Sequence, residues 1–417
     1  MRESHLRADW PQATLAEVAE VAAGVTLGRK LPVYGTVEMP YLRVANVQDG
    51  YLDLDEIKTV RVRPAEVDRY RLRPGDVVLS EGNANLNNLG RATIWRDEIP
   101  GCLHQNIVLR VRCNEHELLP TFLVLITTSA YARRYVRAVA KQTSIAHLGI
   151  TQLERFPVPL PPLRVQQQVV EAATSAERSA AVARDRALKL VDLRRGHLED
   201  LLAPAGSLDD TETQANWPRL PLADVADVAS GVTLGRKLPP YGTVEMPYLR
   251  VANVQDGYLD LDEIKTVRVR PAEVDRYRLE PGDVLMNEGG DFDKLGRGAV
   301  WEGQVGTCLH QNHVFRVRCD HQRVLPGYLA AVCTAAYGRK YFLVHGKQST
   351  NLASISKRDL TRFPVPLAPP SEQRRIVEIL ARYDASIEAE RSREAKFRAI
   401  RDGLLDDLLT GRALAAA

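Results

Sequence analysis

One internal repeat dominates this sequence. The fourteen residues YLRVANVQDGYLDL occupy positions 41–54 and return unchanged at 248–261, which is 207 positions later (41 to 248). The match of residues 24–79 to residues 231–286 fails only at Val33/Pro240, Arg73/Glu280, Val78/Leu285 and Leu79/Met286. A period of this length is far above the 20–50 residues of solenoid repeats and equals the size of a domain. The sequence therefore predicts two copies of one domain.

The similarity continues, with more substitutions, to both ends of each copy. CLHQN at 102–106 returns at 308–312, and RFPVPL at 155–160 returns at 362–367. The segment between the copies, 204–215, is rich in small and acidic residues, which indicates a flexible linker. Two similar domains in one polypeptide suggest a pseudo-dimer with an approximate two-fold axis.

Each copy is expected to combine a mixed globular domain with a long helix. Short runs of Val, Ile, Tyr and Leu alternate with Gly, Asp and Asn, a pattern typical of strands and turns. One helix is predicted at 118–140. A proline-rich joint then blocks both helix continuation and strand pairing, at 157–163 and again at 364–370. These features place the two mixed domains at 9–163 and 216–370.

A helix of about 38 residues, roughly 57 Å long, follows each joint. The predicted helices span 164–203 and 371–410, and neither range contains a proline. Copy one has small side chains on its seam, where copy two has large ones. The two seams are Val169, Ala173, Ala176, Ala180, Ala183, Ala187 and Leu190, and Ile376, Leu380, Tyr383, Ile387, Phe397, Leu404 and Leu408.

Small residues opposite large ones favour two antiparallel helices packed as a coiled coil. The alternative is that each seam packs only on its own globular domain. The first arrangement gives the expected fold class, which is α+β. It has two tandem mixed α/β domains separated by two long antiparallel helices, with pseudo-two-fold symmetry.

No familiar catalytic motif occurs in the sequence. There is no P-loop, GxGxxG after a strand, HExxH, GxSxG or kinase signature. Cys102 and Cys113 recur as Cys308 and Cys319 without a CxxC motif, which favours structural thiols over a zinc site. His104, two residues after Cys102, could form a nucleophile pair with it, but no third group is visible. The chain is therefore not expected to be an enzyme by itself.

Composition leaves the class of partner open. The net charge is +3, from 56 basic and 53 acidic residues, which neither requires nor excludes nucleic acid. Five scattered cysteines fit a reducing compartment, and the first ten residues have no apolar run of signal-peptide length. With no stretch of ~18 apolar residues for a membrane span, a cytoplasmic location without a membrane partner is expected.

The order of mixed domain, proline joint and long helix, repeated once, resembles the specificity subunit of type I restriction-modification enzymes. The residues that carry the resemblance are PYLRVANVQDG, RLRPGDVVLSEG, LGRATIW, LHQNIVLRV and FPVPLPPLRVQQQVV, with their counterparts in copy two. PPSEQ before an apolar helix is a further mark, and copy one departs from it with LRVQQ at 163–167.

The resemblance implies two target recognition domains that each read one half of a split DNA sequence, with the helices fixing the unread spacer. Two methyltransferase subunits would bring S-adenosylmethionine and methylate adenines. Restriction and translocase subunits would use ATP and Mg²⁺ to cleave. This chain would itself hold no cofactor.

The two copies differ most in two polar segments, which are therefore candidates for contact with double-stranded DNA. NANLNN at 83–88 faces GDFDK at 290–294, and an ungapped comparison sets KQTSIAHLGI at 141–150 against KQSTNLASIS at 347–356. Asn, Lys and Asp side chains can hydrogen-bond base edges, whereas solvated loops are the alternative reading. The candidate residues are Arg29, Lys30, Asn83, Asn85, Asn87, Asn88, Arg91, Gln105, Asn106, Lys141, Gln142, Thr143 and Ser144 in copy one, and Arg236, Lys237, Asp291, Asp293, Lys294, Arg297, Gln311, Asn312, Lys347, Gln348, Ser349 and Thr350 in copy two.

Several of these residues have a structural alternative. Arg29 and Lys30 are phosphate anchors or a solvated basic turn, and Arg91 approaches DNA or forms a surface salt bridge. Arg133, on the helix expected at 118–140, could line a phosphate track, whereas its neighbours Tyr131 and Tyr135 are expected in the core. Two other classes of function stay open, which are a structural adaptor that never reads DNA and an orphan nuclease subunit.

Overall fold

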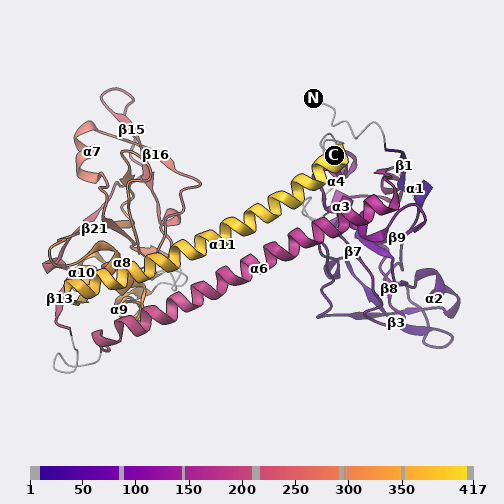
Figure 1. The fold of residues 1–417 in the computed structure, drawn as a ribbon, viewed down its shortest axis with the longest axis horizontal. Coiled ribbons are helices and arrows are strands. Elements are labelled where there is room, and N and C mark those ends of the chain that lie inside the picture. The colour runs from indigo at the N-terminus through magenta and orange to yellow at the C-terminus, as the bar shows by residue number, and fades with distance from the viewer. Residues whose placement is uncertain are drawn as a thin grey trace. The chain divides into compact units, whose positions relative to one another are not determined.

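The computed structural model describes residues 10–83, 89–142, 146–208, 217–290, 295–296, 298–348 and 353–410. The chain forms two compact units. Unit 1 comprises Met1–Arg184 and Arg391–Ala417, and unit 2 comprises Asp185–Glu390. Each unit therefore contains one copy of the mixed domain and part of each long helix (Figure 1).

The mixed domain of unit 1 is built from short strands in four small sheets. The largest has the antiparallel order β2 (Ala19–Ala22), β9 (Val108–Cys113), β5 (Val77–Ser80) and β7 (Ala92–Ile94). A second has the order β4 (Lys58–Val62), β3 (Val37–Leu42) and β8 (Leu103–His104). The others are the pair β1 (Gln12–Thr14) and β12 (Pro157–Pro159), and the sheet β10 (Lys141–Gln142), β11 (Ala146–His147) and β6 (Gly82–Asn83).

Unit 2 repeats the same four sheets. They are β14 (Ala226–Ser230), β21 (Val314–Cys319), β17 (Asp283–Asn287) and β19 (Gly298–Val300); β16 (Lys265–Val269), β15 (Val244–Leu249) and β20 (Leu309–His310); β13 (Arg219–Pro221) and β24 (Pro364–Pro366); and β18 (Gly289–Gly290), β23 (Ala353–Ser354) and β22 (Lys347–Gln348).

The short helices also correspond between the units. They are α1 (Leu15–Val18), α2 (Pro64–Tyr70), α3 (Pro120–Thr128), α4 (Ala130–Val139) and α5 (Ile150–Glu154) in unit 1, and α7 (Pro271–Tyr277), α8 (Pro326–Thr334), α9 (Ala336–His345) and α10 (Lys357–Thr361) in unit 2. A 3₁₀ turn at Leu222–Asp224 takes the place of α1 in unit 2.

The four-stranded sheet of unit 1 separates two apolar clusters. Val77 and Leu79 on β5 point to the cluster that includes Phe122 and Ile126 of α3, whereas Val78 points to the cluster with the buried Trp95. This alternation follows from the period of two along a strand. The sheet is therefore covered by α3 and α4 on one face and by loops on the other.

The single helix predicted at 118–140 is wrong, because two helices meet at Ser129. The backbone of Ser129 is extended (φ −72°, ψ 160°), and its hydroxyl oxygen accepts a hydrogen bond from the amide of Ala132 at 3.3 Å. Ser129 thus caps the second helix. Tyr131 and Tyr135 pack against the core as predicted, half-buried on the apolar cluster of unit 1. Their hydroxyls donate to Pro157 O at 3.0 Å and to Gln152 O at 2.7 Å.

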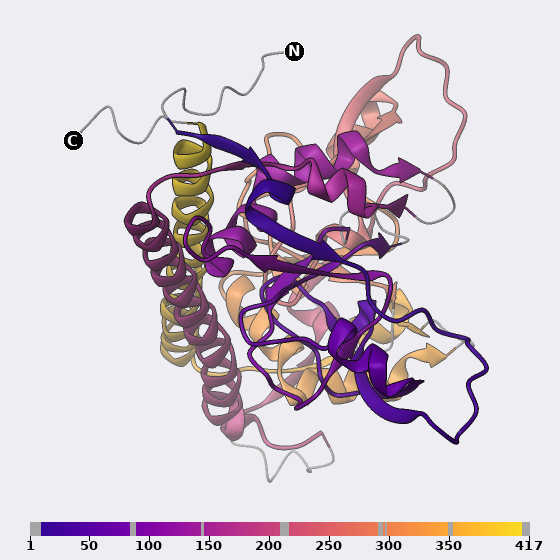
Figure 2. The same ribbon diagram turned by 90° about the vertical axis from the view of Figure 1, so that its right-hand side faces the viewer.

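The two long helices are α6 (Leu163–Leu202) and α11 (Pro370–Thr410). Figure 2 shows the first part of α6 along one side of the strands of unit 1. The predicted α+β fold class with two mixed domains and two long helices is confirmed by these elements.

Both long helices contribute to each unit, in antiparallel order. In unit 1, Leu405 of α11 shares an apolar cluster with Val169 of α6, and Arg401 pairs with Glu177. In unit 2, Arg194 of α6 binds the carboxylate of Asp384 of α11 through two bonds of 2.7 and 3.1 Å. The alternative, that each helix packs only on its own domain, is thereby excluded.

The predicted seams are largely buried. The buried members are Val169, Ala173, Ala176, Ala180, Ala183 and Ala187 on α6, and Ile376, Leu380 and Ile387 on α11. Leu405 is buried instead of the predicted Leu404, which is half-buried, and the side chain of Leu408 lies outside the described residues.

A buried glutamine fixes the start of each long helix. Gln373 Oε1 accepts from the amide of Leu325 at 2.9 Å, and its Nε2 donates to Arg323 O at 3.0 Å and Ala368 O at 2.9 Å. Gln166 makes the corresponding three bonds in unit 1. The LRVQQ departure from PPSEQ therefore keeps the side chain that joins helix and domain.

Candidate nucleic-acid interface

The two segments that differ most between the copies leave from one small sheet. Strand β6 precedes the segment 84–88, and β10 and β11 flank the segment 143–145, while β11 pairs with both β6 and β10. In unit 2, β18 and the pair β22 and β23 hold the segments 291–294 and 349–352 in the same way. The strands that flank the two predicted contact segments thus belong to one small sheet in each unit.

Strand pairing corrects the ungapped comparison of the second segment. Lys141 pairs with His147 in unit 1, and Lys347 pairs with Ser354 in unit 2. The hairpin therefore encloses three residues in unit 1, 143–145, and four in unit 2, 349–352. His147 therefore corresponds to Ser354 rather than to Ala353. The segment 290–294 is one residue shorter than 83–88, whereas 349–352 is one residue longer than 143–145.

A glutamate lies at the foot of these segments in both units. The amide of Glu81 donates to Ile107 O at 3.0 Å, and Glu81 O accepts from the amide of Leu148 at 2.8 Å. Burial raises the pKa of the Glu81 carboxyl, and the charge of nearby His147 opposes this rise. Glu288 makes the same two backbone bonds in unit 2. The CLHQN turn and the small sheet are therefore joined at one residue.

The repeated CLHQN segment is structural and not catalytic. His104 is fully buried with its Nδ1 at 2.6 Å from Val108 O, and burial lowers its pKa to about 4. Burial also raises the pKa of the Cys102 thiol to about 12, so that the thiolate is not available at neutral pH. Gly24 is required beside them, because a Cβ there would lie 1.8 Å from His104 O.

Gln105 and Asn106 occupy a turn with a fixed backbone. The amide of Gln105 donates to Leu42 O and that of Asn106 to Val25 O, each at 2.9 Å, and both residues are half-exposed. Gln311 and Asn312 make the corresponding bonds in unit 2, at 2.9 and 3.0 Å. Their amide side chains are thus positioned at the surface next to the small sheet.

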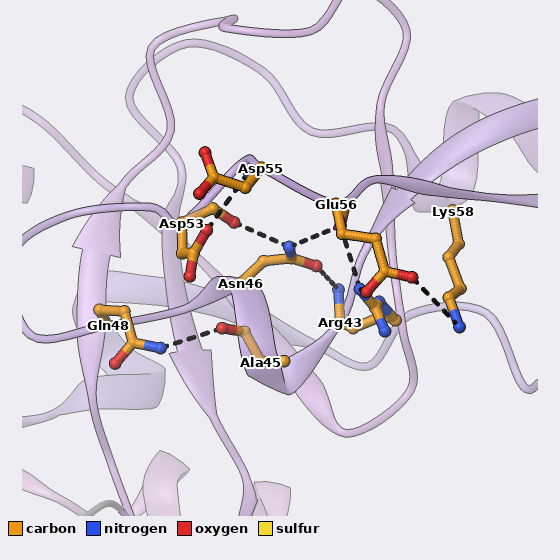
Figure 3. A network of polar contacts seen from close by, with 8 residues as sticks. All are labelled: Arg43, Ala45, Asn46, Gln48, Asp53, Asp55, Glu56 and Lys58. Atoms are coloured by element: carbon orange, nitrogen blue, oxygen red, sulfur yellow. Dashed lines mark hydrogen bonds and ion pairs between the residues drawn. The ribbon is translucent and has the colours of Figure 1, made fainter.

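The duplicated stretch is an ordered loop organised by Asn46 (Figure 3). Asn46 is buried, its Oδ1 accepts from the amide of Arg43 at 2.8 Å, and its Nδ2 donates to Asp53 O at 2.8 Å and Glu56 O at 3.1 Å. Gln48 Nε2 donates to Ala45 O at 2.9 Å. Asn253 repeats these bonds in unit 2. The two copies thus share one scaffold in this stretch.

Some candidate arginines already have partners within the protein. Arg29 pairs with Glu66 at 2.6 Å, and Arg236 pairs with Glu273 at 2.6 Å. Arg91 donates to Gln48 Oε1, and Arg133 binds Asp49 at 2.8 Å and Leu89 O at 2.9 Å. Arg29, Arg91 and Arg236 thus brace the loops that carry them, whereas Arg133 joins helix α4 to the loops of Asp49 and Leu89.

The other candidates divide by whether the structure describes them. Lys30, Lys237 and Lys347 are exposed. Lys141, Gln142, Asn83 and Gln348 lie on the small sheets, and their side chains are outside the described set. Outside the described residues altogether lie Asn85, Asn87, Asn88, Thr143, Ser144, Asp291, Asp293, Lys294, Arg297, Ser349 and Thr350.

Exposed tyrosines in the duplicated region were not among the candidates. Tyr34 and Tyr241 are 96% and 87% exposed, and Tyr51 and Tyr258 are also exposed. Their positions in Gly-containing loops, repeated in both copies, were the available signal. His313 was also missed, although it stands at one of two positions where residues 308–319 differ from residues 102–113.

A family model for the type I restriction modification DNA specificity domain matches residues 7–181 and 214–396, one match in each copy. The chain belongs to this family. Specificity subunits are the non-catalytic, DNA-recognising components of type I restriction-modification complexes, and this is the role of the chain. The predicted resemblance is thereby confirmed.

Curated relatives are distant in sequence. The EcoKI specificity subunit of Escherichia coli K12 is 21% identical over 386 residues, which are 90% of this chain and 82% of that protein. The putative MjaX specificity subunit of Methanocaldococcus jannaschii is 25% identical over 175 residues, which are 42% of this chain and 40% of that protein. The chain thus spans less than half of the MjaX subunit.

Solved structures share the fold of this specificity subunit. The HsdS subunit from Thermoanaerobacter tengcongensis is 19% identical, with a TM-score of 0.51 and 98% of both chains covered. A chain from a study of complex assembly and conformational transition in the type I R-M system reaches a TM-score of 0.61 at 19% identity, covering 98% of this chain and 99% of its own.

The described part of the chain has neither a cluster of metal ligands nor a membrane-spanning helix. Among the residues described, no group of three or more His, Cys, Asp or Glu side chains is placed to hold a metal ion. Within that same part of the chain, no helix has the length and apolar character needed to cross a membrane.

Proposed function

We propose that each unit of this specificity subunit reads one half of a split DNA target, and that α6 and α11 set the length of the unread spacer. The carrying observation is the small sheet β10-β11-β6 with its counterpart β22-β23-β18. In both units the strands that flank the two most divergent polar segments belong to this sheet, and Glu81 or Glu288 joins it to the residue after the Gln-Asn turn. Divergent polar segments on a common scaffold suit two related recognition surfaces.

The long helices suit the role of a spacer. α6 has 40 residues and α11 has 41, so each extends about 60 Å. α6 begins in unit 1 and ends in unit 2, while α11 runs from unit 2 into unit 1. The glutamines at their first turns fix the angle at which each helix leaves its domain. We also propose that a pseudo-two-fold axis relates the two units.

The remaining activities are assigned to partners. Two methyltransferase subunits would use S-adenosylmethionine to methylate adenines, and restriction subunits would use ATP and Mg²⁺ to translocate and cleave, all in the cytoplasm. Because residues 24–79 and 231–286 are nearly identical, the two half-sites would share part of their sequence in inverted orientation.

Salt-titrated DNA binding by the assembled methyltransferase complex tests the proposal. Binding to the target sequence should weaken linearly on a log–log plot as salt rises, because phosphate contacts release counterions. Binding to scrambled DNA should be weaker at every salt concentration. A complex that assembles but binds both DNAs equally would support an adaptor instead. DNA cleavage by this chain alone with Mg²⁺ would reveal a nuclease.

A further inference from the structure

We propose that His313 in unit 2 and His147 in unit 1 are specificity-determining residues, which make the two half-sites differ at a base pair near the foot of the recognition segments. This inference rests on the proposed function and names positions within it. His313 contacts Glu288, whereas His147 lies on the strand that pairs with Gly82, the residue after the corresponding Glu81.

In unit 2 the imidazole comes from the CLHQN turn. His313 directly precedes β21, and its Nδ1 lies 2.7 Å from Oε2 of Glu288. The side chain is 57% exposed, although the amide of Glu288 donates to its carbonyl at 3.0 Å and fixes the backbone. Asn312, one of the candidate base-contacting residues, has its amide nitrogen 3.4 Å from Nε2 of the same ring.

In unit 1 the imidazole comes from the small sheet. Glu81 occupies the position of Glu288, but Ile107 stands where unit 2 has His313. His147 on β11 pairs with Gly82, the residue next to Glu81. Its counterpart in unit 2 is Ser354. The histidine therefore comes from a different element in each unit, while both units retain the glutamate.

The comparison between copies argues against a merely structural pair. Residues 102–113 and 308–319 differ at two positions only, Ile107/His313 and Leu109/Phe315. The second pair is buried in the core, at 0% and 1% exposure. The one surface difference in the segment thus lies at the foot of the recognition segments. An exposed ion pair contributes little to stability, which leaves recognition as the better reason for the difference.

The chemistry of the two arrangements differs at the surface. An Nδ1–H that donates to Glu288 leaves Nε2 of His313 as an acceptor, which faces the amide nitrogen of Asn312 at 3.4 Å and could be taken by a base instead. In the major groove, such an acceptor takes a hydrogen bond from the amino group of adenine or cytosine. An isoleucine at this position offers only apolar contact, as to a thymine methyl group. The two units would therefore favour different base pairs at corresponding positions.

The test is to sequence methylated sites produced by the full chain with its cognate methyltransferase subunits. His313→Ile installs the residue of unit 1, and His147→Ser installs the residue of unit 2. Each should relax or change one base pair in its own half-site, with discrimination reduced about tenfold. The other half-site should stay unchanged.

His321→Ile is the matched control, because His321 is an exposed histidine beyond the opposite end of β21. It should leave the motif unchanged. If His313→Ile lowers methylation at all sites, His313→Gln tests the position with a polar side chain, and it should still alter only one base pair of one half-site.

The outcomes separate the two levels of the proposal. A wild-type complex that methylates no specific motif would overturn the proposed function. A wild-type complex with a bipartite motif that neither histidine variant alters would overturn only the present inference. A change in both half-sites from either single variant would also contradict it.

Discussion

Replacing Gln166 by leucine should loosen the joint between the mixed domain of unit 1 and helix α6. The Gln166 amide is fully buried and makes three hydrogen bonds. Its Oε1 accepts from the amide of Leu119 at 2.9 Å, and its Nε2 donates to Glu117 O at 2.7 Å and Pro161 O at 2.9 Å. Leucine has a similar volume but can satisfy none of these three backbone groups.

The expected cost follows from those three bonds. Each buried hydrogen bond contributes a net ~1 kcal/mol, and groups left unpaired cost at least as much. Gln166→Leu should therefore lower the free energy of unfolding of unit 1 by about 3 kcal/mol. For a unit of roughly 200 residues, this corresponds to a Tm lower by about 6–12 °C.

Denaturant titration followed by circular dichroism measures the change. Gln167→Leu is the control, because Gln167 is the exposed neighbour whose amide donates only to Glu171 at 3.1 Å. It should shift the free energy of unfolding by less than about 0.5 kcal/mol. If both variants behave alike, or if Gln166→Leu is neutral, then the buried amide does not hold the joint and the reasoning is refuted.

Three further predictions concern stability. Burial lowers the pKa of His104 to about 4 from 6.5. Because the unfolded chain takes up this proton first, the free energy of unfolding should fall as the pH drops from about 6.5 to 4, and this group should not affect it above about 7. Denaturation at stepped pH values should show a flatter pH profile for His104→Gln than for the wild type. Gly24→Ala should unfold unit 1 or lower its free energy of unfolding by more than ~3 kcal/mol, because the new Cβ would meet His104 O. Gly196→Ala on α6 should stabilise by up to ~1 kcal/mol, because the new Cβ would have no atom beyond its own helix within 4 Å. Equal effects of the two variants in thermal melts would contradict this prediction. Asp76→Asn should lower the free energy of unfolding by about 3 kcal/mol, because the buried Asp76 carboxylate binds Arg112 through two hydrogen bonds of 2.7 Å. A variant that keeps the wild-type stability in urea would argue against that pairing.

The large-scale organisation was predictable because its signals are long and periodic. The repeat defined the two copies, and the absence of proline placed the helices within one residue of Leu163–Leu202 and Pro370–Thr410. The alanine seam of α6 was predictable for the same reason, since one face of a helix recurs every three or four residues.

The details of the recognition surface depend on pairings that leave no periodic signal. Strands β6 and β11 have two residues each and pair across more than 60 positions (83 to 146). The partner of Arg29, Glu66, lies 37 residues away. Such strand pairings and ion pairs come from tertiary contacts and not from local preference. The break at Ser129 did have a local signal, because Thr127 and Thr128 are poor helix formers and serine is a preferred N-cap residue.

The central claim is that half-site specificity is carried by the segments at the small sheet of each unit. Its most direct measurement is the methylated motif of a chain whose unit 2 carries the segments of unit 1, with 83–88 replacing 290–294, 141–148 replacing 347–355, and Ile replacing His313. The account predicts that the motif becomes a perfect inverted repeat with the wild-type spacer. An unchanged asymmetric motif from this folded, active complex would contradict it.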